Sequence, residues 1–203
     1  MASDTPLKYQ RNTQIVTPIM GVSCDGTELR HICIDDITNA LIAIDFSHHE
    51  THESNFYRSG MNFTLANGNV ATLGLVTPNT SKWLHVVWDL NCSANGTFTL
   101  LEGVTSFSGG ASTTAIQHNR NSSNTSGAVI TRGMTGADLI TPTGGTTLLN
   151  AVLSTGKGAT ISRQSGEEFI LKQNTKYLFR YTNGANANVI QLKLEWYEHT
   201  SNH

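Results

Sequence analysis

The segment FSHHETHE, from Phe46 to Glu53, has the densest group of side chains that could bind a metal or transfer protons. Zinc peptidases use H-E-x-x-H on a helix, where two histidines four residues apart bind the metal and the glutamate polarises water. In this chain His49-Glu50 is followed by His52, one residue too early for that motif. His48 and His52 have the four-residue spacing, but no glutamate follows His48 directly. The spacing therefore argues against a hydrolase.

Two other interpretations of this segment remain open. On a strand, His48, Glu50 and His52 would share one face, and copies meeting at an oligomer axis could bind a metal there. The alternative is a polar edge or loop that forms hydrogen bonds with a neighbour, and the weak helical pattern after Phe46 favours it. We therefore expect no resident metal and no cofactor, with His48 and His52 as the only metal candidates.

The remaining polar groups do not form a catalytic pattern. Asp35-Asp36 and Glu167-Glu168 are adjacent pairs, and adjacent residues on a strand point to opposite faces. His85, within WLHVVW, lies opposite the apolar face and is predicted to be a surface or interface histidine. Trp83, Trp88 and Trp196 are predicted to be buried in strands rather than exposed as a platform for sugars. The sequence therefore predicts a protein that is not an enzyme.

Composition excludes several classes of partner. Only 14% of the 203 residues are charged, well below the usual quarter, and the net charge is −2. No cluster of Lys and Arg indicates nucleic acid or an anionic membrane. No apolar run reaches transmembrane length, and the polar N-terminus does not resemble a signal peptide. Cys24, Cys33 and Cys92 have no CxxC spacing, so we expect reduced thiols made in a reducing cytoplasm.

Most of the chain shows the period of β-strands. Leu84, Val86, Trp88 and Leu90 share one face, as do Ile190, Leu192, Leu194 and Trp196 near the C-terminus. Asn67-Gly68 and Asn95-Gly96 are typical of tight hairpins between neighbouring strands. A third hairpin is predicted between strands Tyr177–Thr182 and Val189–Tyr197. Short strands with turns at steady intervals favour an all-β fold, an antiparallel sandwich that is jelly-roll-like.

Other segments are less regular. Residues 1–17 are polar and without a period, which indicates an extended N-terminal arm. Strands are expected at Leu29–Ile34 and Ala40–Phe46, with a helix from Asp36 to Ile44 as the competing prediction. Thr105 to Gly127 is predicted to be one long surface loop. Thr147 to Ser154 is predicted to be a strand, with a short helix as the alternative.

Three stretches together resemble a family of tailed-bacteriophage virion proteins. They are LIAIDFSHHETHE, QHNRNSSNTSG and LKQNTKYLFRYTNGANANVIQLKLEWYEH, which contain the FSHHE, NRNS and WYEH motifs of that family. The resemblance extends over most of the chain. It implies a structural protein, of the head-decoration or cement type, and it brings no catalytic residues with it.

The resemblance implies a partner and a place of action. We expect the protein to be made in the host bacterial cytoplasm, to bind the major capsid protein on the outer capsid surface, and to form a homotrimer. Residues 1–17 would be an arm and residues 18–203 the sandwich, with residues 18–55 as an alternative capsid-contacting segment. The expected contact residues are Lys8, Tyr9, Arg11, His49 and Arg120. Two rivals remain: a tail, fibre or baseplate component that binds a host glycan, and a glycan-active enzyme.

Overall fold

The computed structural model describes residues 10–11, 14–15, 20–22, 29–31, 46–154, 159–162 and 168–200, with side chains over 47–154 and 168–200. The chain divides into two compact units, Met1–Asp45 and Phe46–His203. The first unit contains two short antiparallel pairs. These are β1 (Gln10–Arg11) with β2 (Gln14–Ile15), and β3 (Met20–Val22) with β4 (Leu29–His31).

The strand predicted at Leu29–Ile34 is confirmed over its first three residues, which form β4. The second strand predicted there, Ala40–Phe46, and the competing helix from Asp36 to Ile44 lie outside the described residues except at Phe46. At Phe46 the strand prediction is wrong, because this residue begins the helix α1 (Phe46–His52).

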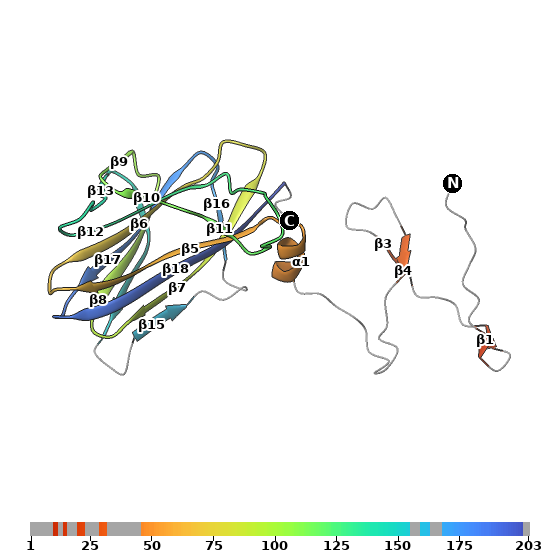
Figure 1. Cartoon of the computed structure of the whole chain (residues 1–203), viewed down its shortest axis with the longest axis horizontal. Helices are drawn as coiled ribbons and strands as arrows, with labels where there is room; N and C mark the ends of the chain where they lie inside the picture. Colours follow the sequence, from red (N-terminus) through yellow and green to blue (C-terminus); the bar gives the residue numbers. More distant parts are fainter. Residues whose placement is uncertain are drawn as a thin grey trace. The chain divides into compact units, whose positions relative to one another are not determined.

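The second unit is a sandwich of two antiparallel sheets (Figure 1). The first sheet, here called the β5 sheet, has the order β11–β5–β18–β7–β15, and β16 also pairs with β7. Its strands are β5 (Phe56–Leu65), β7 (Trp83–Cys92), β11 (Ile116–Gln117), β15 (Ala159–Ser162), β16 (Phe169–Leu171) and β18 (Asn188–His199).

The second sheet, here called the β6 sheet, has the order β10–β12–β6–β17–β8–β14. Its strands are β6 (Val70–Val76), β8 (Gly96–Glu102), β10 (Ala111–Thr113), β12 (Val129–Met134), β14 (Thr146–Leu153) and β17 (Lys176–Asn183). The strand prediction for Thr147 to Ser154 is thus confirmed over the helix alternative.

The strand order is that of a jelly roll. The chain changes sheet at β5–β6, β6–β7, β7–β8 and β17–β18, whereas β8 and β14 pair within one sheet. The central orders β5–β18–β7–β16 and β6–β17–β8–β14 follow from this winding. The predicted all-β, antiparallel, jelly-roll-like sandwich is confirmed.

The three predicted hairpins are wrong, although their turns are present. β5 pairs with β18 and β11, and β6 pairs with β12 and β17, so the strands on either side of Asn67-Gly68 lie in different sheets. The same holds for β7 and β8 and for β17 and β18. Each connection passes from one sheet to the other instead of folding back within a sheet.

Two buried asparagines explain how these turns cross between the sheets. The Asn183 side-chain amide donates to the carbonyls of Leu65 (3.1 Å) and Ala66 (2.7 Å) in the first turn. Asn188, which is fully buried, accepts from Ala94 N (2.9 Å) in the second turn and donates to Asn183 Oδ1 (2.8 Å). All three connections are thereby tied together at one end of the sandwich.

The core between the sheets follows the predicted alternation. The two predicted apolar faces, on β7 and β18, are both buried, with exposed fractions of 0–1% for all eight side chains. Trp88 stacks on Phe169 with ring centroids 5.4 Å apart, and Trp196 stacks on Tyr57 at 6.1 Å. The prediction of buried tryptophans is confirmed for Trp88 and Trp196, while Trp83 is half-buried.

The predicted long loop from Thr105 to Gly127 is wrong, because the stretch contains β9 (Ser106–Ser108), β10 and β11. Gly109 and Gly110 both have positive φ, which turns the chain between β9 and β10. β9 pairs with β13 (Thr141–Thr143). Val104, Ile140 and Leu178 form a second small core with Leu101 and Phe107.

Cys92 is buried, and the other two cysteines lie outside the described residues. No helix in the described part of the chain is long and apolar enough to cross a membrane.

Candidate functional site

The FSHHETHE segment forms α1, so the prediction of a polar edge or loop is wrong, as is the strand alternative. The helix is stopped by a Schellman motif, with Asn55 N donating to Glu50 O (3.0 Å) and Ser54 N to Thr51 O (3.1 Å). Ser54 has φ of 63°, the left-handed conformation that this motif requires. The sequence gives little sign of this helix, because glycine usually occupies the left-handed position that Ser54 holds, and because the helix has only seven residues.

The NRNS stretch keeps Ser54 in this conformation. Gln117 donates its side-chain amide to Ser54 O at 2.8 Å, and Asn119 donates to Ser54 Oγ at 3.0 Å. Asn124 reaches the same carbonyl at 3.4 Å. Since a left-handed serine is strained by about 1–3 kcal/mol, these contacts offset a cost that the turn would otherwise carry.

The WYEH stretch bonds to residues just after FSHHETHE and at the end of the NRNS stretch, next to Ser54. Glu198 N donates to Asn55 O (3.1 Å), and the buried Glu198 carboxylate accepts from Gly127 N (3.0 Å) and from the Ser126 hydroxyl. Trp196 Nε1 also donates to Glu198 Oε1 (3.1 Å). Three stretches far apart in sequence therefore form one bonded assembly, here called the α1 end, opposite the asparagine pair.

Helix α1 separates its polar side chains. His48 and His52 lie on its exposed side with their Nε2 atoms 3.0 Å apart. Glu50 is buried, 4% exposed, and its Oε2 has no hydrogen-bond partner among the described residues. No group of three or more His, Cys, Asp or Glu side chains in the described part could hold a metal ion. The i, i+4 histidines thus form a pair without a third protein ligand there.

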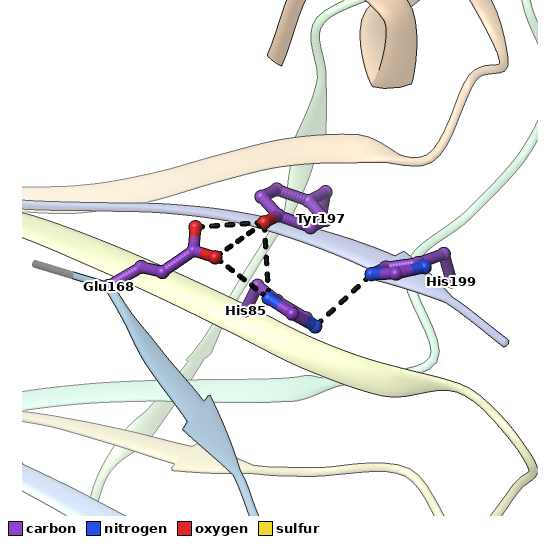
Figure 2. A network of polar contacts seen from close by, with 4 residues as sticks. All are labelled: His85, Glu168, Tyr197 and His199. Carbon is purple, nitrogen blue, oxygen red and sulfur yellow. Dashed lines mark hydrogen bonds and ion pairs between the residues drawn. The ribbon is translucent and has the colours of Figure 1, made fainter. Parts of the chain in front are cut away.

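A second polar cluster lies beside the α1 end, on the outer face of the β5 sheet (Figure 2). His85 Nδ1 lies 3.0 Å from Glu168 Oε1, and the Tyr197 hydroxyl donates to both Glu168 oxygens at 2.7 and 2.8 Å. His199 Nε2 lies 3.1 Å from His85 Nε2. The prediction for His85 was a surface or interface histidine, and at 3% exposed it is not a surface residue, because neighbours within the chain cover it.

The pairing of β7 with β18 and β16 explains how these four residues come together. His85 and Tyr197 are cross-strand partners on β7 and β18, with stacked rings 4.6 Å apart, and His199 is the next outward-facing residue of β18. Glu168 immediately precedes β16, which pairs with β7 on its other side. Sequence reasoning placed His85 and Tyr197 on outward faces, but it could not find their neighbours without the strand pairing.

The distances fit one arrangement of protons. His85 Nδ1–H and Tyr197 O–H both donate to the Glu168 carboxylate, and His199 Nε2–H donates to the unprotonated Nε2 of His85. Burial raises the pKa of Tyr197, and its hydrogen bond to Glu168 raises it further, so the tyrosine stays a donor. Each polar group in this cluster is thus directed at another member, which favours a structural role.

No protein-family model matches this chain, and no curated protein or solved structure matches it either.

The structure places the predicted contact residues separately. Lys8 and Tyr9 lie outside the described residues, and only the backbone of Arg11 is described, in β1. His49 is exposed on α1, with Nδ1 3.5 Å from Glu50 Oε1. Arg120 is exposed in the NRNS stretch, where Nη1 donates to Gln117 O at 3.5 Å. His49 and Arg120 therefore both belong to segments of the α1 end, and their role as contacts stays a prediction.

We expect stability to fall as the pH drops from 7.5 to 5.5. Burial lowers the pKa of His199, as does His85, against opposing effects of Glu50 and Glu168. Burial also lowers the pKa of His118, as do Arg58 and Lys193, against Glu195. Because the unfolded chain then binds more protons than the folded one below about pH 6.5, the free energy of unfolding decreases there.

Urea unfolding at pH 7.5, 6.5 and 5.5 measures this loss. The double variant His118→Asn/His199→Asn should lose less stability over the same range, because it lacks both titrating groups. A wild-type midpoint that does not move, or an equal loss in the variant, would show that these histidines do not control the acid sensitivity. The lowered pKa of Glu102 acts only below its ordinary value of 4.5, outside this window.

Proposed function

We propose that this chain is a non-enzymatic structural protein of a tailed-bacteriophage virion, a decoration or cement protein that binds the major capsid protein on the outer capsid surface. The main support is the α1 end. The three stretches that carry the resemblance lie far apart in sequence. Ser54 and Asn55, which directly follow FSHHETHE, bond to Gln117 and Asn119 of the second stretch and to Glu198 of the third. Their meeting at one place supports the proposal.

The fold agrees with this proposal by analogy. Jelly rolls are used by viral capsid proteins, as well as by lectins and cupins, so the fold alone does not decide the function. The buried tryptophans favour the capsid role over glycan binding, since Trp88 and Trp196 are at most 1% exposed and cannot stack on a sugar. The polar groups beside α1 bond to one another, which suits a rigid scaffold better than an acid–base site.

A decoration protein gains avidity from several contacts that form at the same time. Each contact can be modest, since a homotrimer at a local threefold position engages several capsid subunits at once. In this proposal the arm of residues 1–17 and the exposed residues His49 and Arg120 contact the lattice. The exposed apolar side chains Val129 (56%) and Val152 (81%) add surface that a neighbour could cover.

The number of copies of this chain per virion tests the proposal. Purified virions should contain this chain in a number comparable with the major capsid protein, measured by quantitative mass spectrometry. Adding the purified full chain to particles that lack it should restore that number, and a chain without residues 1–17 should bind more weakly while its circular dichroism is unchanged. A handful of copies per virion would favour the tail component, and none would refute a virion role.

A further inference from the structure

A hollow lies beside Gly60 at the edge of the β5 sheet, where β12 of the β6 sheet also reaches it. It encloses about 410 Å³ and is lined by segments of β5, β18, β11 and β12. A Cβ at position 60 would lie 2.8 Å from Leu192 O, so only glycine fits. Glycine within a strand often marks the close approach of another backbone, and at Gly60 that backbone is β18. We call this depression the Gly60 hollow.

The charged residues that line the Gly60 hollow have one sign, although Asp89 and Glu195 lie next to Lys193. Arg58, Arg132 and Lys193 line it, and no Asp or Glu is among the described lining residues. Lys193 is already balanced, with Nζ 3.2 Å from Asp89 Oδ2 and 3.1 Å from Glu195 Oε2. The two arginines are exposed and have no carboxylate within 4 Å in the described part of the chain.

The pKa of a neighbouring histidine is affected by this charge. Burial lowers the pKa of His118, which follows β11, and Arg58 and Lys193 lower it further against the opposing effect of Glu195. Two guanidinium groups beside a narrow depression are suited to carboxylates, because each offers paired N–H donors that match the two oxygens. The hollow thus has two exposed guanidinium groups in its lining, in a protein whose net charge is −2.

The shape of the surface favours an extended peptide. β11 pairs with β5 only at Tyr57 and Arg58, so no described strand pairs with this side of β5 beyond them. Ile116, 42% exposed, adds an apolar wall to the hollow. An extended segment could lie along this edge, with an acidic side chain toward the arginines and an apolar one against Ile116.

We propose that the Gly60 hollow binds an extended, carboxylate-bearing segment of the major capsid protein. This inference rests on the proposed function for the identity of the partner, while the chemistry of the hollow stands independently. Arg58 and Arg132 bind the carboxylate, and the segment lies along the edge of β5 that no described strand pairs with beyond Arg58.

A peptide titration tests the chemistry without any capsid. The probe is the capped pentapeptide acetyl-Val-Glu-Val-Glu-Val-amide, added to the ¹⁵N-labelled full chain and followed by amide shifts. We expect saturable shifts at Gly60, Asn62 and Ile116, weakened by raising sodium chloride from ~50 to ~300 mM. Arg58→Ala or Arg132→Ala should each weaken binding about tenfold. The control Arg180→Ala, on the β6 sheet, should not.

Several results would overturn the proposal. These are an equal response to the lysine peptide acetyl-Val-Lys-Val-Lys-Val-amide, unchanged binding by the arginine variants, or saturation by sulfate or glucuronic acid but not by the glutamate peptide. On particles, Arg58→Glu/Arg132→Glu should decorate at least tenfold more weakly than Arg180→Glu. If the wild type and the double variant decorate particles equally well, the proposal for the Gly60 hollow is wrong while the proposed function stands. If the wild type does not bind to the particles, the proposed function is wrong. The peptide titration then still tests whether the hollow binds a carboxylate-bearing segment.

Discussion

Replacing Trp196 with alanine is expected to lower the free energy of unfolding by about 3–5 kcal/mol, the usual range for emptying a buried aromatic site. Trp196 has no exposed surface and stacks on Tyr57, while its Nε1 donates to the Glu198 carboxylate. The substitution removes core volume and also takes one donor from a buried anion. Since domains are stable by only about 5–15 kcal/mol, we expect little soluble folded protein at 37 °C.

Urea unfolding at 15–20 °C, a range near maximal stability for many domains, gives the loss if the variant folds at all. Gln191→Ala is the matched control, because it lies on the same strand but is exposed, and it should change stability by no more than about 0.5 kcal/mol. A loss below about 1 kcal/mol for Trp196→Ala would contradict its buried position and would revive the glycan-binding rival.

Asn188→Ala is expected to cost roughly 3 kcal/mol or more, although it removes only a small polar side chain. The Asn188 amide is fully buried and bonds Ala94 N (2.9 Å), the Tyr181 hydroxyl (2.8 Å) and Asn183 Oδ1 (2.8 Å). Alanine would leave Ala94 N without its described partner, and it would remove one hydrogen bond each from the Tyr181 hydroxyl and Asn183 Oδ1. The three connections between the sheets would thereby lose their common anchor.

The matched control is Asn186→Ala, in the same connection. Asn186 is exposed and accepts only from Asn67 N (3.3 Å), so its loss should cost no more than about 0.5 kcal/mol. Chemical denaturation of both variants gives the comparison. Equal small losses would show that the asparagine pair does not stabilise the fold, and that apolar packing alone determines how the strands cross.

Residues of the α1 end show why the candidate site could be predicted only in part. FSHHETHE draws attention by its residue types, yet its helix depends on Ser54, whose left-handed conformation is held by Gln117 and Asn119, more than 60 residues away. His85 and Tyr197 were both placed on outward faces. Their burial comes from Glu168 and His199, which pairing between β7, β16 and β18 brings alongside.

The sequence by itself determined most of the longer strands, the faces of β7 and β18 that are buried, and the all-β class, because alternation of apolar and polar residues is a local property. Only the tertiary structure decided which strands pair. Asn67-Gly68 and Asn95-Gly96 reverse the chain equally well within one sheet or between two sheets. The choice depends on Asn183 and Asn188, whose buried amides bond to carbonyl and amide groups that are distant in sequence. Such bonds form only once both sheets are in place, so no local pattern contains them.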